Sequence, residues 1–238
     1  VKELNQHHEL IILDDAYQHR ALRPGFSILL FDYKSLHDFQ WLLPSGDLRE
    51  PLSGRKRADF IVITKVPQSL LAADRQSLIS KVKPFPHQQV FFSSLEYARL
   101  KLLFHPERKL GLDNIGTDTH ILLLTGIANP LPLVEKLATL SPNITHHHYP
   151  DHHQFSKKNI LKLVKEFKEL PASDKIIITT EKDAQRLTSH QFQELLKALP
   201  VYYLPVKAVI LPPDQERFND LIKEYVRKHS VNNRVYKA

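Results

Sequence analysis

The chain has 238 residues, of which 42% are hydrophobic and 25% are charged. This composition is close to the average of soluble globular proteins and excludes a chain without a hydrophobic core. At about 150 residues per domain, the length favours one large domain or two small ones. Cysteine is absent, which excludes a disulfide framework, a thiolate zinc site and a cysteine nucleophile.

The 33 Lys and Arg residues outnumber the 26 Asp and Glu residues, which gives a net charge of +7. This excess favours an anionic partner such as a nucleotide, a phosphorylated lipid, a membrane surface or nucleic acid, without choosing among them. No stretch reaches the ~18 consecutive apolar residues of a membrane span, so we expect any membrane association to be peripheral. The chain starts at Val1 and contains no methionine, and we therefore expect it to be a fragment.

Short apolar runs alternate with segments of helical periodicity, which is typical of βαβ units and a mostly parallel sheet. We predict strands at residues 10–13, 27–31, 60–64, 120–124, 175–179 and 201–204. Helices are predicted to begin after Ser156, after Asp214 and at the Asn129-Pro130 pair. Residues 95–104 are predicted to form a further strand. The expected domains are residues 1–93 and 119–238, joined by linker strands at residues 94–118.

The segment LIILDDAYQHR ends a predicted buried strand in two adjacent carboxylates, Asp14 and Asp15. Ligands of open α/β folds bind at the carboxyl edge of the parallel sheet. One or two carboxylates together with nucleotide phosphates are enough for a Mg²⁺ site. The pair therefore points to a Mg²⁺-nucleotide site, with Gln18 and His19 placed to bind phosphate or sugar oxygens. The alternative is that both aspartates only cap the following turn.

Basic residues gather in LPSGDLREPLSGRKR, at positions 43–57. Guanidinium groups bind phosphates through paired hydrogen bonds, which makes Arg49 a candidate phosphate ligand. Its loop also contains Gly46 and Pro51, so a structural role is an equal alternative. Lys56 and Arg57 are expected to lie on a solvated basic surface.

The segment HHHYPDHH places five imidazoles within residues 146–153. Pro150 disfavours a helix, so His148 and His152 are not expected to share a helical face, and this argues against zinc. Asp151 is placed to orient a neighbouring imidazole, and an oriented imidazole suits proton transfer near neutral pH. A hydrogen-bonded loop before the Ser156 helix cap is the alternative.

In IIITTEKDAQRL, at residues 176–187, Thr180 and Asp183 have the spacing of a capping box and are expected to satisfy amides at a helix start. Glu181 and Lys182 lie on the same strand-to-helix turn, from which they would face a nucleotide. The phosphate-binding motif G-x-x-x-x-G-K-[ST] is absent. Gly111 and Gly116 have its spacing but precede a threonine instead of a lysine.

Five blocks resemble, in order and separation, those of the tetraacyldisaccharide 4′-kinase family, the lipid A 4′-kinases of Gram-negative outer-membrane synthesis. The blocks are LDDAYQHR, LLPSGDLREPL with RADFIVITK, TGIANP, YPDHHQFS and ITTEKDAQRL, and the resemblance spans residues 10–226. It implies a P-loop kinase-like α/β/α domain joined by strands to a smaller α/β domain.

The resemblance also implies a reaction. The γ-phosphoryl group of ATP would be transferred, with Mg²⁺, to the 4′-hydroxyl of an acylated glucosamine disaccharide 1-phosphate. The implied location is the cytoplasmic face of the inner membrane, with peripheral membrane contact. Nucleic acid is not an expected partner.

By this resemblance, Asp14 and Asp15 match the paired aspartates near Mg²⁺ and the phosphates, and Asp15 is expected to be catalytic. Gln18 and His19 complete that motif, although Ala16 and Tyr17 stand where the family has glycine and phenylalanine.

His152 matches the histidine that is thought to partner an upstream aspartate in activating the sugar hydroxyl. Arg49 matches a family arginine, and Glu181, Lys182 and Asp183 match the TEKDA turn. Arg49, Glu181 and Lys182 are therefore expected to bind substrate.

The family places its P-loop, its catalytic aspartate and a hydrophobic membrane-docking helix before the first of these blocks, and the 238 residues lack all three. Because the P-loop supplies much of the positioning and charge stabilisation, we expect this chain alone to be inactive in phosphoryl transfer. Two alternatives from other classes are a basic nucleic-acid-binding module and a histidine-rich metallohydrolase. Salt-dependent oligonucleotide binding would support the first, and stoichiometric zinc the second.

Overall fold

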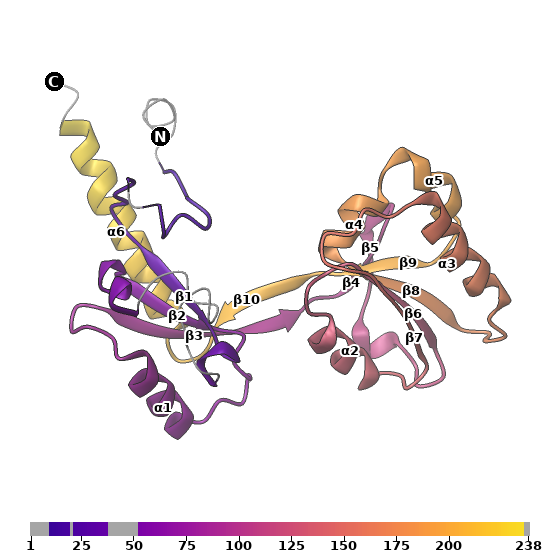
Figure 1. The fold of residues 1–238 in the computed structure, drawn as a ribbon, viewed down its shortest axis with the longest axis horizontal. Helices are drawn as coiled ribbons and strands as arrows, with labels where there is room; N and C mark the ends of the chain where they lie inside the picture. Colours follow the sequence, from indigo (N-terminus) through magenta and orange to yellow (C-terminus); the bar gives the residue numbers. More distant parts are fainter. Residues whose placement is uncertain (1–9, 20, 38–51, 236–238) are drawn as a thin grey trace. The chain divides into compact units, whose positions relative to one another are not determined.

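The computed structural model describes residues 10–19, 21–37 and 52–235, and the chain forms two compact units (Figure 1). Unit 1 comprises residues 1–96 and 208–238, and unit 2 comprises residues 97–207. Each unit is a sheet with helices packed against it, so the predicted α/β class is confirmed.

The sheet of unit 1 has the strand order β1-β2-β3-β10. Its strands are β1 (Ile28–Asp32), β2 (Phe60–Thr64), β3 (Gln89–Tyr97) and β10 (Val206–Ile210). β1 and β2 are parallel, as are β2 and β3. The helices of this unit are η2 (Ser35–His37), η3 (Leu52–Arg57), α1 (Ala72–Val82) and α6 (Gln215–Val235).

Side chains of β2 alternate between two hydrophobic clusters, as the pleat of a strand requires. Ile61 and Ile63 pack in the cluster that includes α1. Phe60 and Val62 pack on the opposite face with Phe91, where α6 covers them. β2 is therefore buried on both faces, which explains why its first four residues, Phe60 to Ile63, are all apolar.

The position of α6 corrects the predicted domain boundaries, which assigned every residue after 118 to the second domain. Phe218 of α6 packs against Phe60 and Phe91, with ring centroids 5.7 Å and 5.0 Å apart. The chain thus returns to unit 1 after Lys207. Of the expected linker at residues 94–118, residues 94–96 belong to unit 1 and residues 97–118 belong to unit 2.

The predicted strand at residues 10–13 is wrong. These residues form no strand, and Leu10, Ile12 and Leu13 have exposed fractions of 54%, 84% and 40%. Within the described ranges, β1 ends the sheet and no strand pairs along its outer edge. An apolar run becomes a strand only where a neighbour supplies backbone hydrogen bonds and a surface to bury against.

The sheet of unit 2 has the order β5-β4-β9-β8-β6-β7. Its strands are β4 (Leu100–Leu102), β5 (His105–Leu110), β6 (His120–Thr125), β7 (Ile144–His148), β8 (Lys175–Thr180) and β9 (Val201–Leu204). β6 is parallel to β7 and β8, and β8 is parallel to β9, whereas β4 is antiparallel to β5 and β9. The short 3-10 helix η4 (Leu112–Asn114) follows β5.

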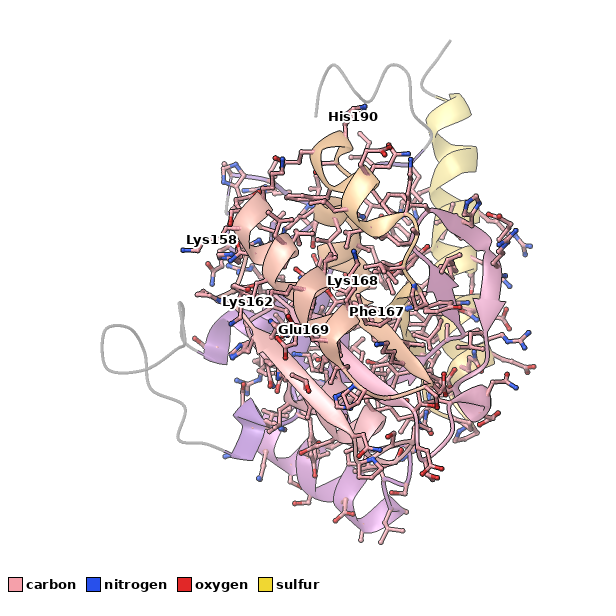
Figure 2. All side chains as sticks on the ribbon, turned by 90° about the vertical axis from the view of Figure 1, so that its right-hand side faces the viewer. Lys158, Lys162, Phe167, Lys168, Glu169 and His190 are labelled. Atoms are coloured by element: carbon pink, nitrogen blue, oxygen red, sulfur yellow. The ribbon has the colours of Figure 1, made fainter. Side chains whose placement is uncertain are left out.

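Helices cover both faces of this sheet (Figure 1). One face carries α2 (Leu131–Ala138), and the other carries α3 (Lys157–Glu169), α4 (Glu181–Leu187) and α5 (His190–Leu196). In α3, a buried apolar stripe faces the sheet, and lysines such as Lys158 and Lys162 lie on the exposed side (Figure 2). No helix in the described part of the chain is both long and apolar enough to cross a bilayer.

Most predicted elements agree with the structure. The strands expected at 27–31, 60–64, 120–124, 175–179 and 201–204 correspond to β1, β2, β6, β8 and β9. α3 begins after Ser156, whose Oγ accepts the amide of Asn159 at 3.2 Å, and α6 begins after Asp214. The strand expected at 95–104 is instead divided between β3 and β4.

Replacing Phe218 with alanine tests the assignment of α6 to unit 1. The change removes the ring contacts with Phe60 and Phe91, and we expect unit 1 to lose about 2 to 3 kcal/mol because the ring is only partly buried. Hydrogen exchange should accelerate in β2 and β3 and stay unchanged in β6 and β8. Leu161→Ala, at an exposed position of α3, is the matched control. Equal acceleration in both sheets would contradict the assignment.

Candidate functional site

Three of the sequence blocks meet at one edge of the unit 2 sheet. β6 and β8 are parallel neighbours, so their carboxyl ends share an edge, where ligands of such sheets bind. Gly126 follows β6, and α4 follows β8. The turn after β7 joins them, because the amides of Tyr149 and His152 donate to the carbonyls of Thr125 and Gly126, at 2.8 Å and 3.1 Å.

A buried carboxylate, that of Asp183, lies at the centre of this edge, with an exposed fraction of 0%. Its Oδ2 accepts hydrogen bonds from the Gly126 amide at 2.9 Å and the Thr180 hydroxyl at 2.7 Å. Its Oδ1 accepts from Nη1 of Arg186 at 2.8 Å. A buried charge is tolerated when it is paired and hydrogen-bonded in this way.

The Thr180 half of the predicted capping box is confirmed, since the Thr180 hydroxyl accepts a hydrogen bond from the Asp183 amide at 3.1 Å. The Asp183 side chain, which was expected to satisfy an amide at the start of α4, instead accepts hydrogen bonds from the Thr180 hydroxyl and from the Gly126 amide in the loop after β6. Gly126 permits this approach. A Cβ at position 126 would lie 3.1 Å from Asp183 Oδ1 and 3.4 Å from His153 Cβ, so the carboxylate would have to shift.

Arg186 connects Asp183 to the predicted catalytic histidine. Its Nη2 lies 3.3 Å from Nδ1 of His152, and its Nη1 also donates to the Gly126 carbonyl at 3.3 Å. The Arg186 side chain is 19% exposed, against 74% for His152. Arg186 was not among the predicted site residues. The spacing of Asp183 and Arg186, three residues apart on one helix, was the sequence feature that could have indicated their ion pair.

His152 has a backbone φ of 58°, in the left-handed region that non-glycine residues seldom adopt. Its amide donates to the Gly126 carbonyl at 3.1 Å and to Asp151 Oδ1 at 3.0 Å, and these bonds stabilise the turn. Asp151 Oδ2 also lies 3.6 Å from His152 Nε2. This distance is longer than a normal hydrogen bond, so the predicted orienting contact is an electrostatic one. Such conformations persist where several contacts fix them, and they cluster at functional sites.

The other imidazoles turn to separate partners. His146 Nε2 lies 2.8 Å from the Thr125 hydroxyl, and His147 Nε2 lies 3.0 Å from Glu166 Oε2, a pair that is ionic only when the imidazole is protonated. Burial lowers the pKa of His146, and the neighbouring imidazoles of His148 and His147 lower it further. In the ranges that the structure describes, no group of three His, Asp or Glu side chains is placed to hold a metal. The metallohydrolase alternative therefore gains no support.

The predicted Mg²⁺ and nucleotide residues lie in unit 1. Asp14, Asp15, Gln18 and His19 are exposed in a segment of turns, and Asp15 has a φ of 48°. The two carboxylates thus lie in a bend after an irregular segment, and not at the end of the predicted buried strand.

Arg57, at the end of η3, binds the segment that contains Asp14 and Asp15. The expectation that Arg57 lies only on a solvated basic surface is therefore wrong. Its Nη2 donates to the Tyr17 carbonyl at 3.1 Å, and its guanidinium lies 4.6 Å from the Tyr17 ring centroid. The Tyr17 hydroxyl in turn donates to the Gly54 carbonyl at 3.0 Å.

The predicted site residues therefore fall into two groups. His152, Glu181 and Lys182 belong to unit 2, with the latter two exposed on the first turn of α4 beside Asp183. The aspartate pair belongs to unit 1. Arg49 lies outside the described residues.

Replacing Asp183 with alanine should destabilise unit 2 strongly. The change leaves the Arg186 charge and the Gly126 amide without their buried acceptor, and we expect a loss of about 3 to 5 kcal/mol in the free energy of unfolding. Urea denaturation monitored by the amides of β6 and β8 measures this. Glu194→Ala removes an exposed ion pair with Lys197 in the same unit and should cost less than about 1 kcal/mol. Similar losses for the two variants would contradict the central role of Asp183.

Comparison with known proteins agrees with the resemblance read from the sequence. The family model of tetraacyldisaccharide-1-P 4′-kinase (LpxK) matches residues 1–227. The tetraacyldisaccharide 4′-kinase of Phocaeicola vulgatus is 40% identical over 224 residues, and that of Bacteroides thetaiotaomicron is 40% identical over 233 residues. Each match covers 94% of this chain but only 61% of the relative.

A solved structure shares the fold. LpxK from Aquifex aeolicus, crystallised in complex with ATP, superposes with a TM-score of 0.56 at 22% identity, covering 89% of this chain and 56% of that one. The chain belongs to the tetraacyldisaccharide 4′-kinase family.

Proposed function

We propose that this chain forms part of a kinase that transfers the γ-phosphoryl group of ATP to the 4′-hydroxyl of an acylated disaccharide 1-phosphate, in lipid A biosynthesis. The family match over residues 1–227 carries this proposal. The meeting of the TGIANP, PDHH and TEKDA blocks at one sheet edge supports it, because that edge is where such folds bind ligands.

Asp14 and Asp15 are proposed to hold Mg²⁺, with Asp15 also acting in catalysis. Their chemistry fits the ion, since exposed carboxylates are the oxygen ligands that Mg²⁺ prefers. Two carboxylates leave ligand positions for nucleotide phosphates and water. When bound, Mg²⁺ would neutralise the charge on the transferring phosphoryl group. Gln18 and His19, on the same segment, are proposed to bind the nucleotide.

His152 is proposed to act at the acceptor hydroxyl. Its imidazole is 74% exposed while its backbone is fixed by two hydrogen bonds, so the side chain is presented from a rigid turn. Glu181 and Lys182 are proposed to bind the substrate from the start of α4, and Arg49 from the loop before η3.

The net charge of +7 suits these anionic ligands. We propose peripheral contact with the cytoplasmic face of the inner membrane. A basic residue near an anionic membrane surface contributes about 1 kcal/mol of attraction, which weakens as salt is added.

The chain alone is proposed to be inactive, because its 238 residues contain no P-loop motif. Phosphoryl transfer from labelled ATP to the disaccharide lipid should stay at the buffer rate with the isolated chain. A chimera that adds the preceding segment of the Phocaeicola vulgatus relative should transfer phosphate. Within the chimera, Asp15→Asn should lower kcat by about 10²-fold or more.

The matched control is Asp220→Asn, at an exposed position of α6, which should leave kcat unchanged. Turnover by the isolated chain at the chimera's rate would refute the proposed inactivity. A folded chimera that binds ATP but never phosphorylates the lipid would refute the proposed function.

A further inference from the structure

The contact between Arg186 and His152 has a chemical direction. A guanidinium group carries only hydrogen-bond donors and no acceptor. In the 3.3 Å contact between Nη2 and Nδ1, the imidazole nitrogen must therefore be the acceptor. An imidazole nitrogen that accepts a hydrogen bond carries no proton, so the neutral ring carries its proton on Nε2.

Arg186 is itself held in place. Asp183 Oδ1 lies 2.8 Å from Nη1, and the same Nη1 donates to the Gly126 carbonyl at 3.3 Å. The carboxylate behind it is fully buried and accepts two further hydrogen bonds, so it is not free to turn away. The planar guanidinium spans from this carboxylate to the imidazole, a geometry that the point charge of a lysine does not reproduce.

The second carboxylate near the ring agrees with this proton placement. Asp151 Oδ2 lies 3.6 Å from Nε2, on the side where the ring would present an N–H donor. A donor at Nδ1 would instead face the positive charge of the Arg186 guanidinium, which offers no acceptor.

We propose that Arg186 is a positioning residue that holds His152 in one orientation and one tautomer, with the lone pair on Nδ1 and the proton on Nε2. The tautomer of His152 can be tested without the proposed function. Only the consequence of that tautomer for phosphoryl transfer rests on the proposed function. If His152 acts at the acceptor hydroxyl, it does so as a hydrogen-bond donor through Nε2. The proton that leaves the hydroxyl must then pass to another base, such as a carboxylate, unless Nδ1 first leaves Arg186.

Histidine NMR on the chain itself tests the proposal, and this requires neither substrate nor transfer activity. In ¹⁵N-histidine-labelled protein, two-bond ¹H–¹⁵N correlations report which ring nitrogen carries the proton. The spectra are recorded at a pH of about 8.5, where an unperturbed imidazole is neutral. The loss of one set of ring signals in His152→Gln assigns this residue among the 14 histidines.

We expect the His152 ring to populate the Nε2–H tautomer almost alone in the wild-type chain. Arg186→Met removes the donor at similar length, and the Nδ1–H population should rise about fivefold, the bias expected of a partly exposed, charge-assisted hydrogen bond. Arg186→Gln, too short to reach both Asp183 and His152, should give the same change if the methionine variant does not fold. Lys197→Met, which removes an exposed cation directly after α5, should leave His152 unchanged.

A wild-type ring with Nδ1 protonated, or tautomer populations that are equal in the wild type and in both Arg186 variants, would overturn the proposal. Unchanged amide signals in β6 and β8 separate a local effect from unfolding. A failed phosphoryl transfer assay would bear on the proposed function and leave this result intact.

Discussion

The buried carboxylate of Asp183 is the constraint on which the site of unit 2 depends. A charge taken out of water must keep its hydrogen-bond donors, and these donors come from the loop after β6, the end of β8 and the second half of α4. The turn after β7 is bound to the same network, since the His152 amide donates to the Gly126 carbonyl. The arrangement of several loops at one sheet edge thus follows from one buried charge, and it leaves an exposed imidazole on a fixed backbone.

The fold could be predicted where local pattern and burial agree. β2 and β9 have the predicted bounds, because each is a short, largely apolar run that packs into a sheet, and charged residues bound β2 while prolines bound β9. Residues 10–13 have the same pattern but pair with no strand that the structure describes, and periodicity does not report whether a neighbour exists. The same limit applies to α6. Its apolar stripe predicts a buried face, but only the tertiary structure shows that Phe60 and Phe91 cover it.

The candidate site, like the fold, could be predicted only in part. The Thr180 cap and the exposed Glu181 and Lys182 follow from spacing within one turn of helix, which the sequence displays. The contact between Arg186 and His152 joins residues 34 positions apart, and the bond from Arg57 to Tyr17 joins residues 40 apart. No spacing rule relates such pairs. Family resemblance identified the blocks, and the structure adds the residues that connect them.

Amide hydrogen exchange at Gly126 tests most directly whether Asp183 organises the site. The Gly126 amide lies in a loop, and its hydrogen-bond acceptor is the buried Asp183 carboxylate at 2.9 Å. We predict that it exchanges as slowly as the amides of β6 and β8, through unfolding of the whole unit, because releasing it would strand a buried charge. Exchange at the rate of an exposed loop, with the two strands still protected, would contradict the account.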